Sequence, residues 1–490
     1  MTTKATTHVC LISAYDSSGH AGHSCDLRTV QDLGAHGLGV ISALTAQNSQ
    51  RVLDITTTPP QSLAQQCEAL EQDIQIDAIK IGMLAGIEQL AVLQDFLARQ
   101  QCPVIADPVF GSSSGTRFAD ADFIARYLEL LPHITLLTPN LPEAEQLLQR
   151  PLRSAPEVEA AAAELRQLGA GAVLIKGGHS DWGGDEVADY FDDGERRIWL
   201  THQRQQTLYS RGTGCMLSSA IAALCAGGKA LPDALVLAEA YVQQGLRTGF
   251  AIGECGGLLG NCGHPTRLSD FPSLHLPETA DSRPAFPGCG DEPLGLYPLV
   301  DSVEWLQRVL DAGVSTVQLR MKHATETELE QAVTAAVKLS QSYGARLFIN
   351  DHWQLAIRSG AYGVHLGQED LSTEALDALA NAGLRLGISS HSEFEWLRAL
   401  ALKPSYLALG AVFGTTSKSG VKAIGLENLH RWMAIIDSKL PVVAIGGINQ
   451  SNIGEVLSAG VSGCAVVGAI SGPGPCITGL QALQKSFRMH

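Results

Sequence analysis

The sequence predicts two α/β domains, the first with a mostly parallel sheet covered by helices and the second a closed TIM (β/α)8 barrel. The chain of 490 residues is long enough for two domains. Short apolar runs alternate with helical stretches in both halves, as in βα folds. Between them, hydrophobic periodicity fades and Gly, Pro, His and Cys accumulate. We therefore expect domains at residues 1–255 and 295–490, with a linker at 256–294.

Composition limits the classes of function. A net charge of −16 argues against a broad nucleic-acid surface, so phosphate binding must come from local basic groups or helix N-termini. Eleven cysteines without a CxxC pair or a zinc-ligand spacing indicate reduced thiols, and we expect no metal at the linker cysteines. No apolar run approaches the ~18 residues of a membrane helix. We expect a cytoplasmic protein with small-molecule substrates, and the sequence leaves open whether it is a homo-oligomer.

The first half contains a series of polar strand ends. Ligands of parallel βα sheets bind at the carboxyl ends of the strands, and Asp107-Pro108-Val109, Thr138–Glu143 and Lys176–His179 lie at such ends. Turn formation and helix capping explain each of these segments equally well when it is taken alone. The predicted strands are Val9–Ser13, Asp77–Ile81, Pro103–Asp107, Ile134–Thr138 and Ala172–Lys176.

A sharper signal is the glycine-flanked segment Gly212-Thr213-Gly214-Cys215, which runs into a helix over Ala220–Leu224. Glycines at a helix entrance allow backbone N–H groups to converge on an anion, and the helix dipole adds to the attraction. The segment therefore predicts an anion site in the first domain.

Together these motifs resemble the hydroxymethylpyrimidine (phospho)kinase family, which has the ribokinase-like fold, over about residues 8–250. The resemblance implies phosphorylation of hydroxymethylpyrimidine or its phosphate by ATP. It places Asp26, Gln47 and Val109 in the pyrimidine pocket; Lys176, Gly212, Thr213 and Gly214 at the anion hole and ATP; Cys215 at the catalytic thiol; and Asp107 and Glu143 at the Mg²⁺ of ATP. The motifs are Ala43–Asn48, Lys80–Leu84, Asp107–Val109, Thr138–Ala144, Lys176–His179 and Gly212–Cys215.

Two departures from that family leave an alternative open. The first loop, Ala14–Gly22, lacks two glycines and a proline of the family pattern, and Arg211 stands where a His is common. Such changes alter how closely the backbone can approach a substrate. The alternative is that the first domain is a weakened, pyrimidine-binding regulatory module and only the second domain is an active enzyme.

The second half contains eight apolar runs that alternate with helical stretches, which is the pattern of a TIM barrel. Functional groups should then lie at the carboxyl ends of the strands. The predicted strands are Leu296–Val300, Val314–Leu319, Arg346–Asn350, Gly363–Leu366, Leu384–Ser389, Tyr406–Ala411, Val442–Ile445 and Cys464–Val467.

Charged groups at these strand ends suit a diphosphate with a divalent metal. Gln318, Arg320 and Lys322 would face inward together by the two-residue period of a strand. Asp351 and Asp370 offer hard oxygen ligands for Mg²⁺, and the two cations would neutralise phosphoryl oxygens. The alternative for the cations is a solvated strand face.

The last two strands end in Gly446-Gly447-Ile448 and Val467-Gly468, where barrels commonly bind a phosphate on backbone N–H groups. A phosphate site distinct from the diphosphate site implies two phosphorylated substrates. For Gly446-Gly447 alone, a tight turn is an equally good explanation.

The second half as a whole resembles thiamine phosphate synthase. The resemblance implies that Mg²⁺, Arg320 and Lys418 stabilise a departing pyrophosphate while a thiazole nitrogen captures the pyrimidine methylene cation. The loop Gly414–Lys418 and Gly468 depart from the family pattern in single residues. By resemblance, the pyrimidine diphosphate contacts Gln318, Leu319, Arg320, Met321, Lys322, Asn350, Ser389 and Lys418; Asp351 and Asp370 hold Mg²⁺; and the thiazole phosphate contacts Thr415, Thr416, Ser417, Gly447, Val467 and Gly468.

The sequence thus predicts a fused enzyme of thiamine biosynthesis, with a kinase that makes hydroxymethylpyrimidine diphosphate and a synthase that consumes it. A different phosphate-handling barrel, such as an aldolase or epimerase, would need a Lys or a carboxylate pair deep in the barrel. No Lys lies inside a predicted barrel strand other than at the rim. A third hypothesis makes the first half a pyrimidine sensor that regulates the second.

Overall fold

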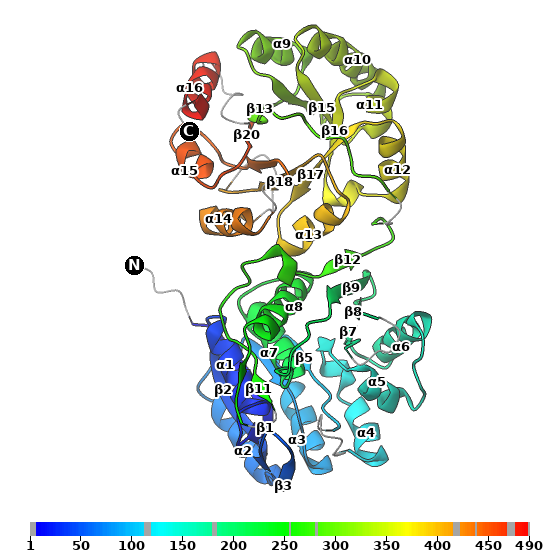
Figure 1. Ribbon diagram of the computed structural model, residues 1–490, viewed down its shortest axis with the longest axis vertical. Coiled ribbons are helices and arrows are strands. Elements are labelled where there is room, and N and C mark those ends of the chain that lie inside the picture. The colour runs from blue at the N-terminus through cyan, green and yellow to red at the C-terminus, as the bar shows by residue number, and fades with distance from the viewer. Residues whose placement is uncertain are drawn as a thin grey trace. The chain divides into compact units, whose positions relative to one another are not determined.

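The protein was analysed as a computed structural model, which describes residues 6–111, 119–178, 184–253, 256–279, 283–414, 422–436, 439–467 and 476–488. Its contacts divide the chain into two compact units, Met1–His275 and Leu276–His490 (Figure 1). The division falls inside the segment predicted as a linker. No helix of the described part of the chain is both long enough and apolar enough to span a membrane.

The first unit is built on a sheet of ten strands in the order β12-β9-β8-β7-β6-β5-β4-β1-β2-β3. Its centre, from β7 through β1 to β2, is parallel, and the flanking pairs are antiparallel. The cores of all the predicted strands are present. The strands are β1 (His8–Asp16), β2 (His36–Gln47), β3 (Val52–Thr57), β4 (Ala78–Ile81), β5 (Val104–Ala106), β6 (Leu136–Leu137), β7 (Ala172–Ile175), β8 (Glu186–Asp192), β9 (Arg197–Gln203) and β12 (Ser273–His275).

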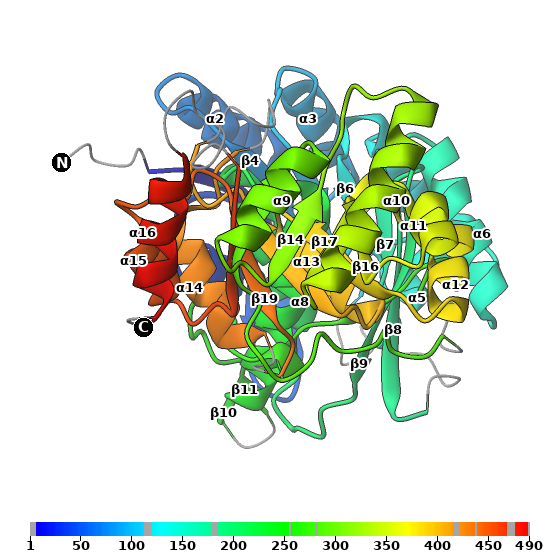
Figure 2. The ribbon, with the colours of Figure 1, turned by 90° about the horizontal axis from the view of Figure 1, so that it is seen from above.

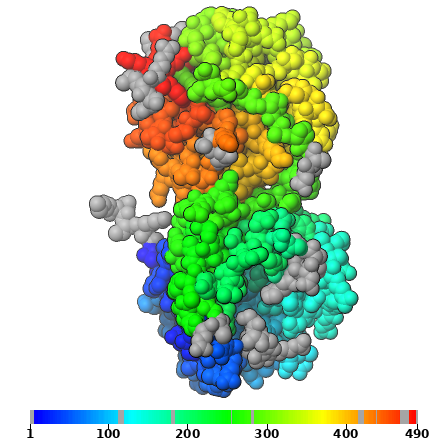
Figure 3. Space-filling model, in the orientation of Figure 1, coloured from blue at the N-terminus to red at the C-terminus, as the bar shows by residue number. Residues whose placement is uncertain are grey.

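Helices cover this sheet, and the residues at their ends explain where several begin. Asp120 caps α4, while Asn140 and Glu143 form a reciprocal capping box at α5. Helix α8 is almost wholly buried, and the green segment after it forms part of the surface in Figure 3. The helices are α1 (Gly22–Asp32), α2 (Pro60–Glu71), α3 (Ile87–Leu97), α4 (Ala121–Leu128), α5 (Leu141–Leu148), α6 (Ala155–Gln167), α7 (Thr213–Ala226) and α8 (Leu231–Arg247), with 3-10 turns Leu131–His133 and Leu268–Asp270 and a small ribbon of β10 (Phe250–Ala251) and β11 (Gly257–Leu258).

The second unit is a closed barrel of eight parallel strands, in which β20 pairs back with β13. This confirms the predicted TIM barrel. Each strand is a short run of mostly buried residues, because the barrel interior covers one face and the helices cover the other. The strands are β13 (Gly295–Val300), β14 (Thr316–Leu319), β15 (Arg346–Asn350), β16 (Gly363–Leu366), β17 (Arg385–Ser390), β18 (Tyr406–Gly410), β19 (Val442–Ile445) and β20 (Gly463–Val466).

The outer helices of the barrel lie around these strands (Figure 2). Side-chain caps begin α9, α10, α12 and α13, through Ser302, Thr325, Ser372 and Ser392. The helices are α9 (Val303–Asp311), α10 (Glu326–Ser342), α11 (Trp353–Ser359), α12 (Thr373–Asn381), α13 (Glu393–Ala401), α14 (Gly425–Ile435), α15 (Ile453–Leu457) and α16 (Cys476–Arg488), with a 3-10 turn at Gln368–Asp370.

Aromatic rings fill the barrel interior. Tyr297, Phe348 and Tyr406 pack edge-on or tilted against one another, with ring centroids 5.1 to 5.9 Å apart. Gly387 makes this packing fit, because a Cβ atom there would lie 2.1 Å from the Tyr406 ring. The interior is therefore a packed core, and functional groups are confined to its carboxyl end.

Candidate active sites

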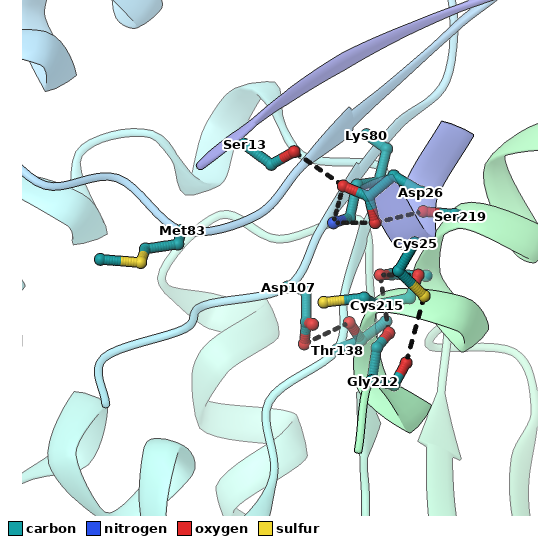
Figure 4. Close-up of polar contacts among 12 residues, drawn as sticks. Ser13, Cys25, Asp26, Lys80, Met83, Asp107, Thr138, Gly212, Cys215 and Ser219 are labelled. Carbon is teal, nitrogen blue, oxygen red and sulfur yellow. Dashed lines mark hydrogen bonds and ion pairs between the residues drawn. The ribbon is translucent and has the colours of Figure 1, made fainter. Parts of the chain in front are cut away.

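The first site lies where the ends of β5 and β7 meet the N-terminus of α7. Asp107 follows β5, Lys176 follows β7, and the Lys176 Nζ atom is 2.6 Å from Asp107 Oδ1. A Cβ atom on Gly214 would lie 3.1 Å from that Nζ and 3.2 Å from Asp107 Oδ2. The first turn of α7 therefore rests directly on the ion pair, and only a glycine fits there without displacing it. Figure 4 shows Asp107 beside Thr138, Gly212 and Cys215.

Buried charges at this site shift one another's pKa values. Burial raises the pKa of Glu143 to about 7, with Asp107 adding to the rise and Lys176 opposing it. For Lys176, burial is outweighed by Asp107 and Glu143, and its pKa is raised. Lys176 is joined to the start of α5 by a bridge with Asn140. The structure thus brings the predicted residues Asp107, Glu143, Lys176 and Gly214 together.

A second cluster lies behind this site and is wholly buried. Asp26 on α1 accepts hydrogen bonds from Lys80 Nζ at 2.8 and 2.9 Å, from Ser13 Oγ at 2.7 Å and from Ser219 Oγ at 2.9 Å (Figure 4). Both side chains of the Asp26–Lys80 pair are 0% exposed. Burial opposes the charge on Lys80, but Asp26 overcomes it and the pKa of Lys80 is raised. The pyrimidine contact predicted for Asp26 stays a prediction, since its carboxylate is occupied by protein donors.

Cys215 lies in the first turn of α7, as predicted, but its surroundings differ from the expectation. A helix N-terminus lowers a thiol pKa when the thiol is solvated. Here burial raises the pKa of Cys215 to about 11, although Lys80 opposes the rise. Cys215 is therefore a neutral thiol near pH 7. The nearby Cys25 thiol is 3.8 Å from the Gly212 carbonyl oxygen.

The altered first loop is held by its own polar groups. Asp16 accepts hydrogen bonds from the backbone N–H groups of Ser18 at 2.8 Å and Ala21 at 3.0 Å. Arg211 reaches the Ser49 carbonyl oxygen at 2.8 Å, just beyond β2. The loop is thus tied down without the glycines and proline that it lacks. Four other predicted residues of this domain are partly buried. They are Gln47 at the end of β2, Val109 just after Asp107, and Gly212 and Thr213 at the start of α7.

A further buried group of ionisable side chains lies under the end of β7. Asp189 Oδ1 accepts a hydrogen bond of 2.6 Å from the Gly177 N–H. His202 Nε2 lies 3.2 Å from Glu239 Oε2. Burial raises the pKa of Glu239 to about 7 and lowers that of His202 to about 4. Sequence reasoning missed this group, because the hairpin of β8 and β9 was not predicted and only the fold brings it beside Glu239 of α8.

The second site lies at the carboxyl mouth of the barrel. Asp351 follows β15, and Asp370 ends the 3-10 turn after the adjacent strand β16. Desolvation by neighbouring groups and the charge of Asp370 raise the pKa of Asp351, although its side chain is exposed, and Arg320 opposes the rise. The two carboxylates and the guanidinium are therefore close enough to interact, at one mouth of the barrel. Asp351 has a left-handed backbone with φ 63°, a conformation that Asp tolerates better than most residues.

The strand that was predicted to carry the cations ends before it reaches them. β14 ends at Leu319, so Gln318 points into the barrel, Arg320 is partly buried and Lys322 is exposed. Arg320 keeps strand geometry at its N–H, which donates to the Val300 carbonyl oxygen at 2.8 Å. Gln318 thus faces the barrel interior, where its Nε2 atom is 3.4 Å from Tyr297 Oη, and the inward direction predicted for Arg320 and Lys322 stays a prediction. Leu319 is buried, Met321 is partly buried, Asn350 ends β15 and Ser389 lies near the end of β17.

The proposed thiazole phosphate site is described only in part. Gly447 has φ 66°, and a Cβ atom there would lie 2.8 Å from the Gly414 carbonyl oxygen, so the turn after β19 closely approaches the loop after β18. Val467 directly follows β20. The predicted residues Thr415, Thr416, Ser417, Lys418 and Gly468 lie outside the described residues, as do His179 and Cys255.

The residues present at the barrel mouth fit a divalent cation shared with a ligand. Across the described part of the chain, no group of three or more His, Cys, Asp or Glu side chains could hold a metal ion by itself. The charge of Asp370 contributes to the raised pKa of Asp351, so a cation between the two carboxylates would be favoured, and Mg²⁺ commonly completes its shell with phosphate oxygens and water. The donor set therefore suits Mg²⁺ bound together with a diphosphate.

The comparisons with known proteins leave a gap between two matches, and the division between the two units of the fold falls inside that gap. The sequence matches the phosphomethylpyrimidine kinase family over residues 16–259 and the thiamine monophosphate synthase family over residues 296–470. The chloroplastic thiamine biosynthetic bifunctional enzyme of Arabidopsis thaliana is 32% identical, over 98% of this chain and 93% of its own length.

Other relatives match one half. The thiamine-phosphate synthase of Serratia proteamaculans is 55% identical over 36% of this chain and 84% of its own length. The structure of the pyridoxal kinase from Staphylococcus aureus in complex with ADP covers 56% of this chain and 99% of its own, with a TM-score of 0.50 and 28% identity. The two halves are thus similar to two separate enzyme classes, and both occur together in the plant relative.

Proposed function

The chain belongs to the family of thiamine biosynthetic bifunctional enzymes, and from that premise we propose which of its residues carry each of the two activities. Its first half is a phosphomethylpyrimidine kinase domain and its second half a thiamine-phosphate synthase domain. The kinase phosphorylates a hydroxymethylpyrimidine substrate, and the synthase joins the pyrimidine diphosphate to a thiazole phosphate with release of pyrophosphate.

In the kinase domain, we propose that ATP is the phosphoryl donor and lies with its phosphates at the N-terminus of α7. The S. aureus pyridoxal kinase structures include complexes with ADP and with AMP-PCP. Backbone N–H groups from Gly212 to Gly214 would receive phosphoryl oxygens, and Lys176 would exchange its bond to Asp107 for one to a phosphate. Asp107 and Glu143 would then hold Mg²⁺, which neutralises charge on the transferring group.

Gln47 and Val109 would border the pyrimidine in this proposal. Asp26 would act through Lys80, by keeping that ammonium in place beneath Cys215. Because the Cys215 thiol is neutral, it would serve as a hydrogen-bond donor beside the anion hole until substrate binding alters its surroundings.

In the synthase domain, we propose that the reacting groups meet at the carboxyl mouth of the barrel. The bond between the pyrimidine methylene carbon and the diphosphate oxygen breaks, and the thiazole nitrogen forms the new bond to that carbon. Arg320, Lys322 and Lys418 would take up the charge that develops on the leaving pyrophosphate. Asp351 and Asp370 would hold Mg²⁺, which neutralises the same charge.

The remaining contacts would fix the two substrates. Gln318, Asn350 and Ser389 would bind the pyrimidine, with Leu319 and Met321 beside it. Backbone N–H groups at Gly447, Val467 and Gly468, with the hydroxyls of Thr415, Thr416 and Ser417, would bind the thiazole phosphate. The observation that carries the synthase proposal is the pairing of Asp351 with Asp370 at one mouth of the barrel, next to Arg320.

The test supplies the full-length protein with hydroxymethylpyrimidine, ATP, Mg²⁺ and thiazole phosphate, and measures thiamine phosphate. A second reaction replaces the first two reagents with pyrimidine diphosphate, so that it reports the synthase alone. We expect Asp107→Asn to stop the first reaction only, and Asp351→Asn with Asp370→Asn to stop both. Full turnover by the double variant would contradict the assigned metal site, and product in the second reaction alone with wild type would favour the regulatory alternative for the kinase domain.

A further inference from the structure

One part of the chain lies outside both family matches and still packs on the barrel. It is the joining segment, residues 276–279 and 283–294, which belongs to the second unit and precedes the synthase match. Arg283 of this segment donates to Asp377 Oδ1 of α12 at 2.7 and 2.9 Å. It also donates to the Glu278 carbonyl oxygen at 2.7 Å. The joining segment is therefore attached to a helix of the barrel close to Glu278.

The side chain of Glu278 forms an ion pair with Arg398 of α13. Arg398 Nε is 2.8 Å and Arg398 Nη2 is 2.6 Å from Glu278 Oε1. The Arg398 side chain is 19% exposed and that of Glu278 is 12% exposed, so solvent screens this pair less than a pair on the open surface. Removing one partner of a shielded pair leaves the other charge poorly compensated. The carboxylate of Glu278 therefore holds the guanidinium in place.

The other side of the same guanidinium holds Gln368. Arg398 Nη1 donates to the Gln368 carbonyl oxygen at 3.1 Å and to Gln368 Oε1 at 3.3 Å. A guanidinium is planar and rigid, so binding its Nε and Nη2 atoms to a carboxylate also sets the direction of Nη1. Glu278 thus acts on Gln368 through Arg398.

The Gln368 side-chain amide has one orientation in this network. Arginine can only donate, so the amide atom that faces Arg398 is the acceptor Oε1, and Nε2 is left to donate. Gln368 Nε2 donates to the Ser389 carbonyl oxygen at 2.8 Å and to the Glu395 carbonyl oxygen at 3.3 Å. Both of these partners can only accept, so turning the amide over would break all of these side-chain bonds. Gln368 is thereby bridged to β17 and to α13.

Gln368 begins the 3-10 turn that ends at Asp370, the proposed Mg²⁺ ligand. Asp370 Oδ2 accepts a hydrogen bond from the Gly367 N–H at 3.2 Å, and the Asp370 N–H donates to the Gly367 carbonyl oxygen at 3.2 Å. The turn is therefore compact, and the position of Gln368 determines that of the Asp370 carboxylate. Groups that orient a metal ligand commonly change metal affinity by about 10–100-fold.

We propose that Glu278 and Arg398 are positioning residues of the synthase, which hold the turn Gln368–Asp370 in the conformation that receives Mg²⁺ and a diphosphate. The proposal rests on the proposed function, in which Asp370 holds Mg²⁺. It makes the joining segment a functional part of the synthase, although that segment lies outside the synthase match. Loss of the Glu278 charge loosens the turn and weakens the binding of Mg²⁺ with a diphosphate.

Glu278→Gln in the full-length protein tests the hold on the turn, since it removes the charge and keeps the shape of the side chain. Hydrogen exchange is measured without Mg²⁺ on peptides that contain residues 367–372. We expect the amide groups of the turn to exchange about tenfold faster than in wild type, the equivalent of one charge-assisted hydrogen bond. Exchange at the turn equal to that of wild type would overturn the proposal.

Peptides from β14 and β18 are the internal reference for that measurement. They should exchange as in wild type, because the proposal confines the effect to the turn. Acceleration to the same extent in the turn and in both strands would mean that the substitution destabilises the whole barrel, and it would also overturn the proposal.

Arg398→Met removes the guanidinium itself and should accelerate exchange at the turn more than Glu278→Gln does. Because Glu278 acts through Arg398, the double variant should match Arg398→Met. A further acceleration in the double variant would contradict this order of contacts. Glu71→Gln is the matched control, because Glu71 is likewise paired with an arginine, Arg99, at 2.8 Å in the first unit. Its turn Gln368–Asp370 should exchange as in wild type.

Calorimetry with pyrophosphate measures the consequence for the site. With Mg²⁺ present, we expect Glu278→Gln to bind pyrophosphate about tenfold more weakly than wild type. Adding Glu278→Gln to Asp370→Asn should have no further effect, because the carboxylate that the turn positions is already absent. Pyrophosphate binding equal to that of wild type would overturn the proposal, because the turn would then be held without consequence for the site.

A separate readout distinguishes this proposal from the function on which it rests. Wild-type protein is tested in parallel for thiamine phosphate formation from pyrimidine diphosphate and thiazole phosphate. Absence of product would contradict the proposed function, and hydrogen exchange would still decide whether Glu278 holds the turn. Product formation together with unchanged exchange in Glu278→Gln and Arg398→Met would overturn the positioning role alone.

Discussion

The two active sites of this enzyme hold their charges in opposite ways. In the kinase domain, Asp26 and Lys80 are fully buried and bonded to each other, and Asp107 is bonded to Lys176. At the barrel mouth, Asp351 and Lys322 are exposed, and no ion pair joins either of them to another described residue. The kinase charges are satisfied by one another within the protein, whereas Asp351 and Lys322 at the barrel mouth are open to solvent and to the ligands proposed above.

This difference determines what a change of charge should do. A buried ion pair gives little net stability, but the loss of one partner leaves an uncompensated charge in a medium that solvates it poorly. An exposed charge contributes little to folding. Substitutions in the kinase domain should therefore appear mainly as loss of stability, and those in the synthase domain as loss of activity.

The largest expected effect is that of Lys80→Met, which leaves the Asp26 carboxylate buried without its cation. We expect the first unit to lose about 3–5 kcal/mol of stability. Hydrogen exchange of peptides from β1 and β4 measures the loss within that unit. Asp26→Leu combined with Lys80→Met should restore most of the stability, because no charge is then left unpaired. An equal loss in the double variant would contradict the contrast between the sites.

Arg320→Met tests the other side of the comparison. We expect synthase kcat/KM to fall by about 10²–10³-fold, the usual cost of removing one group that stabilises developing negative charge. Stability should change by less than about 0.5 kcal/mol. Turnover with pyrimidine diphosphate and thermal unfolding give the two quantities. Lys338→Met, on the exposed side of α10, is the control and should change neither.

Asp351→Asn addresses the metal. We expect the Mg²⁺ concentration for half-maximal synthase activity to rise about tenfold, because one of the two charged ligands becomes neutral. Titration of Mg²⁺ in the synthase reaction measures the change. The kinase reaction of the same protein is an internal control, and its Mg²⁺ requirement should stay the same. A shift in both requirements would mean that the substitution acts on the whole protein.

The smallest expected effect is a change in how stability depends on pH. The pKa of Glu239 is raised to about 7 in the folded protein, against about 4.3 in an unfolded chain. Folding therefore favours the protonated form, and the stability that Glu239 contributes is lost as the pH rises through about 7. Other charged side chains influence the pKa values of this buried group, namely those of Asp189, His202, Lys176 and Asp270.

Glu239→Gln cannot lose that proton. Relative to wild type, the variant should therefore be more stable at pH 8 than at pH 5, by about 1.4 kcal/mol for each unit of pKa shift that is removed. Thermal unfolding at the two pH values measures the difference. Stability differences that are equal at both pH values would show that Glu239 ionises normally.

The sequence predicted the barrel almost strand by strand. The bounds of β15, β16 and β19 agree with the predicted runs, since each run is apolar and ends sharply in a polar residue or glycine. The hairpin of β8 and β9 was missed, because charged residues such as Glu186 and Arg197 interrupt its apolar pattern. Tertiary pairing at the edge of the sheet decides the structure of such segments, and local sequence does not reveal it.

The sequence predicted which site residues lie close together where neighbouring strands fix their adjacency. Asp351 and Asp370 follow consecutive strands, so the fold alone brings them together. The same reasoning gave no sign of remote partners, such as the Lys80 cation of Asp26, which lies 54 residues away in the chain. Nothing local in the sequence tells whether a carboxylate faces a substrate or a buried lysine.

The segment between the matched families also has a consequence for anyone who wishes to produce the two enzymes separately. β12 pairs with β9, and Asp270 is bonded to Arg247 at 2.6 Å, so residues up to His275 complete the kinase sheet. On the other side, Arg346 binds the carbonyl oxygens of Glu292 and Pro293. We propose His275–Leu276 as the place to divide the gene. A cut near residue 255 would remove β12 and leave the edge of β9 unpaired and prone to aggregation. A cut near residue 295 would remove the carbonyl groups of Glu292 and Pro293 to which Arg346 donates.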